Sequence, residues 1–263
     1  MSNKQLLTTI DNLGRATLIL NRPERHNAFD DSLISELTAE LKRLAADPEV
    51  RLVCLTGAGK SFSAGADLEW MRRMADYSEA ENLADSKALA ELMQTLDSLP
   101  KPTLALVQGA AFGGGVGLVA ACDLVLATPE AIFCLSEVKL GLIPAVISPY
   151  VIAAIGARAA RRYFISAERF TAKRARQLGL VHKVIHAENL AKEADRLTRL
   201  LLQNSPHAMA MAKKLVAEVS HRPIDAELIA ETAERIARVR SSDEGREGLS
   251  AFLEKRHPRW VKG

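Results

Sequence analysis

The stretch AAFGGGVGLVAACD, residues 110–123, places three consecutive glycines before an apolar segment with the length of a short helix. A fourth glycine, Gly117, falls where that helix is already running, although glycine inside a helix costs about 1 kcal/mol relative to alanine. The apolar run TLALVQG comes just before it and predicts a strand. A strand, a glycine-rich loop and a helix in this order are typical of α/β proteins with parallel strands.

The surrounding sequence predicts the same alternation of strands and helices. QLLTTID and RATLILN flank the turn signal NLG and predict a hairpin, and the almost wholly apolar RLVCLTG predicts a strand buried on both faces. Asp30 to Ser32 supply N-cap candidates for a helix that runs to about Ala46, with Leu33, Leu37, Leu41 and Leu44 on one face. Strands are also predicted in DLVLAT, AIFCL and LVHKVI, and the last part of the chain predicts helices. We therefore predict a core over residues 1–190 and a helical region over residues 191–263.

Composition and charge narrow the class of protein. The 263 residues are 48% hydrophobic and 25% charged, as in an ordinary globular protein, and the net charge of +3 is too small to indicate a nucleic-acid partner. No apolar run is long enough to span a membrane, and the N-terminus lacks a secretory signal. Cys54, Cys122 and Cys134 lie in apolar runs and are predicted to be buried free thiols. We expect a cytoplasmic protein, or one inside an organelle if a targeting piece has been removed, without a membrane or nucleic-acid partner.

A second glycine-rich loop, SFSAGADL at residues 61–68, also follows a predicted strand. Neither loop has the spacing of a phosphate-binding loop, and neither has the acidic residue that completes a dinucleotide-binding unit. A helix N-terminus presents backbone N–H groups without intrahelical partners. Two such groups, one from each loop, could stabilise an oxygen that becomes negative during a reaction. Tight packing of a helix on a sheet, without any ligand, explains either loop equally well.

Five motifs together resemble one known family. RPERHNAF, SFSAGADL, GAAFGGGVGLVAACDLVLAT, FCLSEVKLGLIP and TAKRARQLGLVHKV occur in the order and spacing of the crotonase superfamily, which includes the enoyl-CoA hydratases and isomerases. The similarity covers roughly residues 8–260. It implies an α/β spiral of ββα units, a helical C-terminal trimerisation region, and trimers or dimers of trimers. It also implies an acyl-CoA thioester substrate, so that coenzyme A is part of the substrate and no separate cofactor is expected.

The resemblance also implies site residues. It places the two N–H groups that hold the thioester oxygen on Ala66 and Gly114, and the general base on Glu137. The positions that match contacts to coenzyme A are Arg25, Ala28, Ala64, Ala66, Asp67, Leu68, Gly114, Phe252 and Lys255. Asp67 is also expected to cap the helix that follows it. None of the six histidines has the spacing of metal ligands, so we expect no metal.

The sequence departs from the hydratase pattern at one catalytic position. Many hydratases of this family use a second glutamate, and that position is Gly117 here. Members with one glutamate include Δ3,Δ2-enoyl-CoA isomerases and hydratases that act on branched, carboxylated acyl groups. The run IPAVISPYVIAAIGARAARRYF replaces a glycine-rich segment of other members and looks most like methylglutaconyl-CoA and isohexenylglutaconyl-CoA hydratases, which serve leucine and acyclic-terpene breakdown.

We therefore predict hydration of a 2-enoyl-CoA of the 3-methylglutaconyl type. On this hypothesis Gly117 leaves room for a bulkier or carboxylated acyl group, and Ser148 or Tyr150 is considered as a polar neighbour of the acyl chain. Two alternatives stay open. One is a Δ3,Δ2-enoyl-CoA isomerase that uses Glu137 alone, and the other is a non-catalytic or RNA-binding relative.

Overall fold

Two hydrogen-bonded sheets form the framework of the computed structural model, which describes residues 4–261. The chain divides into two compact units. The first contains residues 4–99 and 103–194, and the second contains residues 100–102 and 195–261. The main division falls between Ala194 and Asp195, close to the predicted boundary at residue 190.

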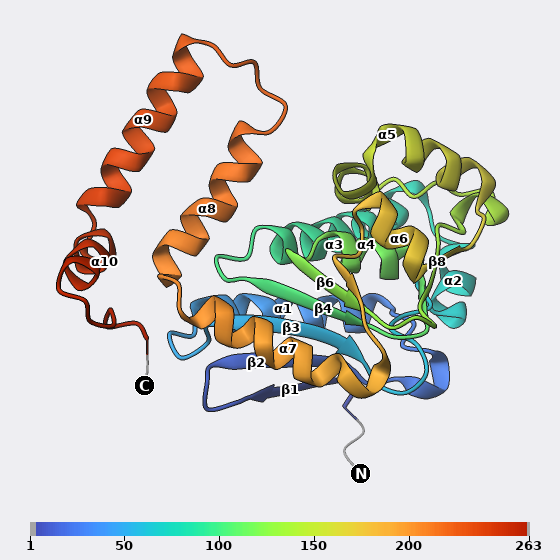
Figure 1. Ribbon diagram of the computed structural model, residues 1–263. Helices are drawn as coiled ribbons and strands as arrows, with labels where there is room; N and C mark the ends of the chain where they lie inside the picture. The colour runs from blue at the N-terminus through green and yellow to red at the C-terminus, as the bar shows by residue number, and fades with distance from the viewer. Residues whose placement is uncertain (1–3, 262–263) are drawn as a thin grey trace. The chain divides into compact units, whose positions relative to one another are not determined.

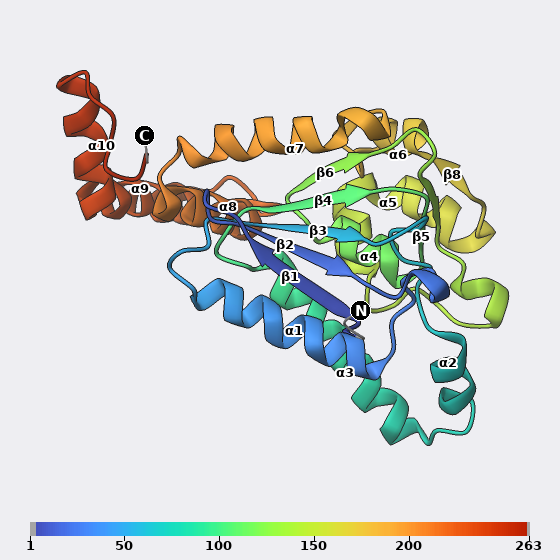
Figure 2. The same ribbon diagram turned by 90° about the horizontal axis from the view of Figure 1, so that it is seen from below.

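The larger sheet has six strands in the order β1-β2-β3-β4-β6-β9 (Figure 2). Their bounds are β1 Leu6–Ile10, β2 Arg15–Leu20, β3 Leu52–Gly57, β4 Thr103–Val107, β6 Leu124–Ala127 and β9 Lys183–Val184. β1 and β2 form the predicted antiparallel hairpin, and every other neighbouring pair is parallel. The first four residues of β3 are all buried, as expected for a parallel strand covered on both faces.

The smaller sheet contains three short strands: β5 Ala110–Phe112, β7 Ile132–Cys134 and β8 Phe170–Thr171. β5 pairs with β7 in parallel, and β7 pairs with β8 in antiparallel orientation. The sequence predicts β7 within the apolar run AIFCL but does not predict β5 or β8. β5 is important for the site, since it comes directly before the glycines of the opening stretch.

Helix α1, Asp31–Ala46, forms as the leucine spacing predicts. Asp30 caps it by accepting a hydrogen bond from the N–H of Leu33, which satisfies one of the free donors at a helix start. The buried face contains all four predicted leucines: Leu33, Leu37, Leu41 and Leu44. This helix packs against α3, Glu79–Asp97, which begins with a capping box formed by Ser78 and Glu81 (Figure 2).

Four shorter helices and two 3-10 turns complete the first unit together with α5, Ser148–Ser166 (Figure 1). A non-helical residue, Gly156, interrupts α5 with a φ of 75°. The remaining helical elements are η1 Pro23–Arg25, α2 Leu68–Met74, α4 Gly114–Ala120, η2 Glu137–Leu140, α6 Ala172–Leu178 and the first part of α7. The cysteines Cys54, Cys122 and Cys134 are buried and form no disulfide within the described residues, as predicted.

The second unit is helical, as predicted. It contains the end of α7, Ala187–Leu202, and the helices α8 Pro206–Val219, α9 Ala226–Ser241 and α10 Asp243–Leu253. The buried carboxylate of Glu247 anchors the chain after α10, because it pairs with Arg256 and Arg259. The hydrogen bond from Arg256 lowers the pKa of Glu247 to about 2. Across residues 4–261, we find no helix that is both long and apolar enough to cross a bilayer.

Candidate active site

Main-chain hydrogen bonds hold the loop after β3 against the segment that leads into α1. The N–H of Phe29 donates to the carbonyl of Gly65 at 2.8 Å, and the N–H of Asp67 donates to the carbonyl of Phe29 at 3.0 Å. Together they form an isolated parallel bridge between Phe29 and Ala66. Because both neighbours of Ala66 are tied, the peptide of Ala66 has a fixed place.

The same loop is bonded on its other side to β5. The N–H of Ser63 donates to the carbonyl of Ala110 at 3.0 Å, and the N–H of Phe112 donates to the carbonyl of Ser63 at 2.9 Å. This second parallel bridge lies two residues before the glycine run at 113–115. The two glycine-rich loops of the sequence are therefore bonded side by side.

A buried asparagine, Asn27, also holds the loop after β3 in place through side-chain hydrogen bonds. Asn27 has no exposed surface and a φ of 55°, a left-handed conformation that asparagine tolerates better than most residues. Its side-chain NH₂ group donates to the carbonyls of Ala58 and Ser61, and its side-chain oxygen accepts from the N–H of Arg22. These hydrogen bonds explain why the motif RPERHNAF has an asparagine at position 27. Its side chain joins the turn before α1 to the loop after β3.

The N–H groups of Ala66 and Gly114 have no acceptor among the residues that the structure describes. Gly114 is the first residue of α4, where an N–H lacks an intrahelical partner. Both residues are partly exposed, and both line the same cavity. Two unpaired donors in one cavity form the arrangement that stabilises a developing oxyanion.

Three consecutive glycines precede and begin α4, and a different constraint explains why each position is glycine. Gly113 has a φ of 51°, which side chains other than glycine rarely adopt. A Cβ atom at Gly114 would lie 2.3 Å from Cζ of Phe29, and one at Gly115 would lie 2.6 Å from the carbonyl oxygen of Ser63. The run therefore combines one unusual backbone conformation with two close approaches, and these approaches bring the start of α4 against the neighbouring loops.

Glu137 lies at the start of η2 and reaches over the glycine run. A Cβ atom at Gly113 would be 3.3 Å from its Oε1 atom. Its Oε2 atom is buried and has no hydrogen-bond partner among the described residues. Burial raises the pKa of Glu137 above that of an ordinary glutamate, because a low-dielectric environment disfavours the charged form. An unpaired buried carboxyl group of this kind is typical of a general acid or base.

The cavity in front of Glu137 has a volume of about 240 Å³. It contains Ala66, Gly114 and Glu137 together, so the structure brings the three predicted catalytic positions into one site. Helix α3 contributes the polar side chains of Asn82, Asp85 and Ser86 to the lining of this cavity. The full lining is Phe29, Ala66, Trp70, Met74, Asn82, Asp85, Ser86, Leu89, Gly114, Glu137, Ile143, Pro144, Ala145, Val146 and Ile147.

The expectation that Gly117 leaves room in the site is wrong. Gly117 is buried, and a Cβ atom there would lie 2.3 Å from Cγ2 of Ile147 and 3.2 Å from Cε of Met93. Ile147 therefore fills the space that a side chain at position 117 would need. The sequence contains Ile147 within AVISPY, but no pattern in that stretch indicates that its side chain packs on Gly117.

The predicted coenzyme A contacts fall into two groups. Arg25 pairs with Asp67 at 3.1 Å and with Glu69 at 2.9 Å, and the hydrogen bond to Glu69 is the main reason why the pKa of Arg25 is raised. Asp67 is buried and caps α2, as expected, by accepting hydrogen bonds from the N–H groups of Glu69 and Trp70. Burial raises the pKa of Asp67, but hydrogen bonds from Arg25 and from the backbone outweigh this and lower it.

The remaining predicted contacts are neutral or belong to the second unit. Ala28 is buried, the N–H of Ala64 donates to the carbonyl of His26, and the side chain of Leu68 is exposed. Phe252, at the end of α10, is exposed, and Lys255 follows it with a φ of 54°. Both belong to the C-terminal unit, which is described by itself, so their contacts with coenzyme A stay predictions.

The two polar candidates in the segment after Pro144 do not line the cavity. The hydroxyl group of Ser148 donates to the carbonyl of Ala145 at 2.7 Å, and Tyr150 packs against the hydrophobic core. Sequence reasoning instead missed the polar residues of α3. Asp85 accepts a hydrogen bond of 3.0 Å from the indole N–H of Trp70, which ties α2 to α3, and Asn82 and Ser86 lie on the same side of the helix at a spacing of four residues.

Comparison with known proteins agrees with this fold. A crystal structure of an enoyl-CoA hydratase from Shewanella pealeana is 49% identical, with a TM-score of 0.95, and the match covers 98% of this chain and 96% of that one. Two proteins from Escherichia coli K12, a 2,3-dehydroadipyl-CoA hydratase and a 1,2-epoxyphenylacetyl-CoA isomerase, are each 34% identical. The matches cover 92% of both chains for the hydratase, and 94% of this chain and 95% of that one for the isomerase.

The α/β fold inferred from the motifs is confirmed by the likeness to this crystal structure. The family model described as enoyl-CoA hydratase/isomerase matches residues 12–263, and this range includes both glycine-rich loops and Glu137. The chain therefore belongs to the enoyl-CoA hydratase/isomerase family.

Proposed function

We propose that this protein adds water across the C2=C3 bond of a 2-enoyl-CoA thioester. One observation carries the proposal: two unpaired N–H groups, on Ala66 and Gly114, line the same cavity as a buried carboxyl group without a partner, Glu137. The donors suit an oxygen that gains negative charge, and the carboxylate suits a water molecule that must lose a proton.

The chemistry follows from these groups. The carboxylate of Glu137 removes a proton from water while the water oxygen bonds to C3, and the π electrons move through C2 to the thioester oxygen. The N–H groups of Ala66 and Gly114 stabilise the resulting enolate oxygen, and one such donor contributes about 3 kcal/mol. The protonated carboxyl group then donates its proton to C2, which gives a 3-hydroxyacyl-CoA and returns Glu137 to its charged form. One carboxyl group therefore performs both proton transfers.

The substitution Glu137→Gln tests this role. We expect the rate of hydration to fall by a factor of about 100 to 10,000, because a general base is lost. The variant should also have a higher melting temperature at pH 7, since the buried charge destabilises the folded wild type. This advantage should shrink as pH falls through the raised pKa of Glu137 towards the pKa of an unfolded glutamate, because the wild-type carboxyl group then becomes neutral.

The pH dependence of wild-type kcat/KM provides the companion measurement. Activity needs the charged form of Glu137, so it should fall tenfold per pH unit below a pKa that lies above the usual 4.5. The exposed Glu130→Gln is a matched control that should change neither property. An active Glu137→Gln enzyme, or an acid limb at an ordinary glutamate pKa, would contradict the assignment.

The contact between Gly117 and Ile147 gives a second test. Gly117→Glu should unfold or inactivate the protein, because its Cβ atom would overlap Ile147. Adding Ile147→Ala should restore part of the stability of the Gly117→Glu variant, because it removes Cγ2, the nearest overlapping atom, and leaves only the Cβ atom of residue 147 at 2.9 Å. Thermal melts of the two single variants and the double variant measure this coupling. Equal melting temperatures for Gly117→Glu with and without the second change would show that Ile147 does not exclude a side chain at position 117.

For the acyl group we propose the 3-methylglutaconyl type. The support is the glycine at position 117 in place of a second glutamate, the segment around Ala145–Ile147, and similarity to a hydratase named for a dicarboxylic acyl group, 2,3-dehydroadipyl-CoA. Among the described residues, the cavity lining contains no lysine or arginine. Ser86 is therefore the lining side chain that would donate a hydrogen bond to the distal carboxylate of the substrate, because the side-chain NH₂ group of Asn82 already donates to the carbonyls of Tyr77 and Ser78.

A panel of acyl-CoA substrates, with products identified by mass, tests the reaction and the acyl group. We expect a gain of one water with 3-methylglutaconyl-CoA, at a higher kcat/KM than with crotonyl-CoA. Ser86→Ala should raise KM for the carboxylated substrate more than for crotonyl-CoA. Faster conversion of 3-enoyl-CoA substrates without a change of mass would favour isomerisation, and no turnover of any substrate would favour a non-catalytic relative.

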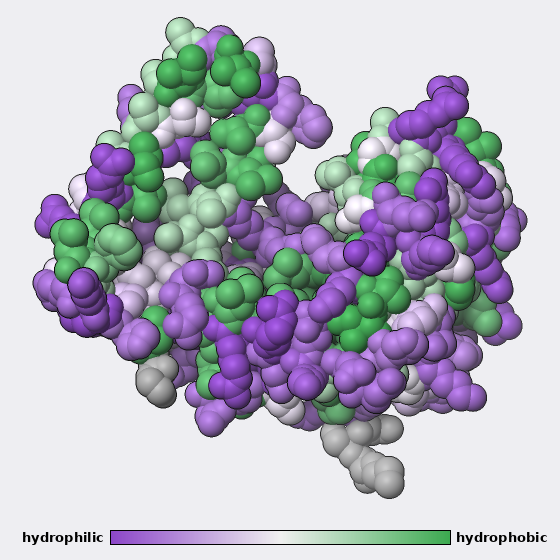
Figure 3. Space-filling model, viewed as in Figure 1, coloured by the Kyte–Doolittle hydropathy of each residue, from purple (hydrophilic) through white to green (hydrophobic). Residues whose placement is uncertain are grey.

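We also propose that the chain assembles into trimers or dimers of trimers. Hydrophobic side chains gather on the exposed faces of the C-terminal helices (Figure 3). The exposed set in this unit includes Val216, Ile224, Ile229, Ile236, Leu249, Phe252 and Leu253. Exposed apolar faces of this extent are typical of protein interfaces. Sedimentation equilibrium should give three or six times the chain mass of 28.6 kDa, and a monomer would contradict the proposal.

A further inference from the structure

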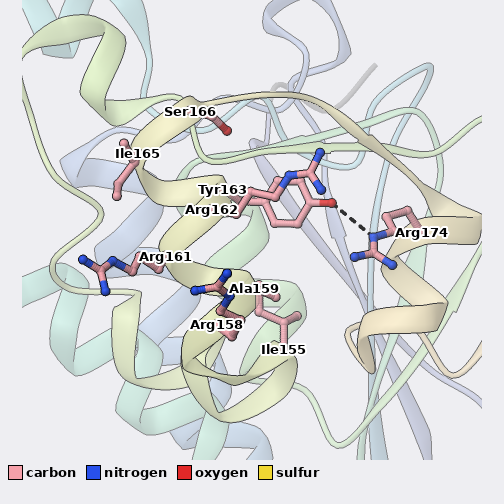
Figure 4. Close-up of a pocket in the computed structure, with 9 residues that line it drawn as sticks. All are labelled: Ile155, Arg158, Ala159, Arg161, Arg162, Tyr163, Ile165, Ser166 and Arg174. Carbon is pink, nitrogen blue, oxygen red and sulfur yellow. Dashed lines mark hydrogen bonds between the residues drawn. The ribbon is translucent and has the colours of Figure 1, made fainter.

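A second hollow, with a volume of about 680 Å³, lies along the last part of α5 and reaches α6. Four of its nine lining residues are arginines: Arg158, Arg161, Arg162 and Arg174 (Figure 4). Ile155, Ala159, Tyr163, Ile165 and Ser166 complete the lining. It contains no carboxylate of its own and shares no residue with the cavity at Glu137.

Two of these arginines are already engaged. Arg162 pairs with both carboxylate oxygens of Glu168, and Arg174 donates to the hydroxyl group of Tyr163 at 3.3 Å and to Gln177 at 3.2 Å. The side chains of Arg158 and Arg161 make no ion pair or hydrogen bond with any residue that the structure describes. The hollow therefore has an excess of positive charge that the first unit does not neutralise.

Local helix effects do not account for this charge. Residues three or four positions apart face each other on a helix, so Arg158 repels both Arg161 and Arg162, which disfavours the helix. Cations are favoured by the helix dipole only within the last turn, and α5 has no basic residue in its last turn. Packing does not explain them either, because the side chains of Arg158 and Arg161 are exposed.

The arrangement of the donors indicates the class of ligand. A guanidinium group presents paired N–H donors that match two oxygens of a phosphate, and it stays charged at any physiological pH. The hollow combines such donors from two helices with an apolar wall formed by Ile155 and Ala159. A surface that met only solvent would need neither the concave shape nor two unpaired guanidinium groups beside each other on one helix.

We propose that this hollow binds a small anion with two linked phosphate groups, at a site separate from the acyl-CoA cavity. Arg158 and Arg161 are the primary donors. Arg174 contributes a third guanidinium group from α6, and the Arg162–Glu168 pair closes the end of the site.

Isothermal titration of the full-length protein with inorganic pyrophosphate tests the proposal. We expect saturable binding at one site per chain, and a Kd raised at least tenfold in the double variant Arg158→Ser/Arg161→Ser. The variant Lys42→Ser/Arg43→Ser removes the same charge from exposed positions of α1 and should keep the wild-type Kd. Hydration of crotonyl-CoA should be the same in all three proteins, which shows that the variants are folded.

Three results would overturn the inference. Equal weakening by both double variants would mean that pyrophosphate responds only to net charge. Loss of binding in Arg25→Ser, with wild-type binding in Arg158→Ser/Arg161→Ser, would place the anion among the predicted coenzyme A contacts. A smaller assembly of Arg158→Ser/Arg161→Ser by sedimentation would mean that these arginines meet a second copy of the chain instead.

Discussion

Four main-chain hydrogen bonds around the loop at residues 63–67 determine the geometry of the site. Two join this loop to Phe29, and two join it to β5, so a single loop is fixed between the start of α1 and the start of α4. The N–H of Ala66 comes from this loop, and the N–H of Gly114 comes from the helix that follows β5. Because backbone groups rather than flexible side chains supply both donors, their positions are set before a substrate binds. Preorganised donors of this kind need no rearrangement during the reaction.

The same framework holds the carboxyl group of Glu137 where burial makes its charged form energetically unfavourable. The Oε2 atom of the partly buried Glu137 is buried without a hydrogen-bond partner among the described residues, which costs stability in the absence of a ligand. The surrounding structure keeps it there, since η2 begins at Glu137 and the glycine run leaves space for its side chain. Loss of stability at a catalytic group is a common consequence of selection for activity. The burial that destabilises the charged form of Glu137 also raises its pKa, and this makes the carboxylate a stronger base.

The sequence predicts the fold well because its signals are local. The leucine spacing of α1, the hairpin of β1 and β2 and the buried run of β3 each follow from neighbouring residues. The motifs also identify the three catalytic candidates, which the structure brings into one cavity. The interpretation of Gly117 as a source of space fails because the contact that explains this glycine is not local. Its lack of a side chain reflects a contact with Ile147, thirty residues later in the chain, and spacing along the sequence carries no information about that contact.

The polar residues that α3 contributes to the cavity, and the arginine-lined hollow, also depend on contacts between elements that are distant in the sequence. Asn82, Asp85 and Ser86 belong to a helix that reads as a solvated element in the sequence, and their place in the cavity appears only after α2 and α3 are joined through Trp70. The arginines of α5 gain a common hollow only when α6 packs beside them.

The claim that the N–H groups of Ala66 and Gly114 polarise the thioester is tested most directly by the carbonyl stretching frequency of a bound substrate. Difference infrared spectra of ¹³C-labelled crotonyl-CoA bound to the inactive Glu137→Gln variant would measure it. Two strong hydrogen bonds should shift the carbonyl band to a lower frequency than in water and narrow it, because the carbonyl bond is weakened in one fixed environment. A band at the frequency found in free solution, with crotonyl-CoA saturating the protein, would contradict the account.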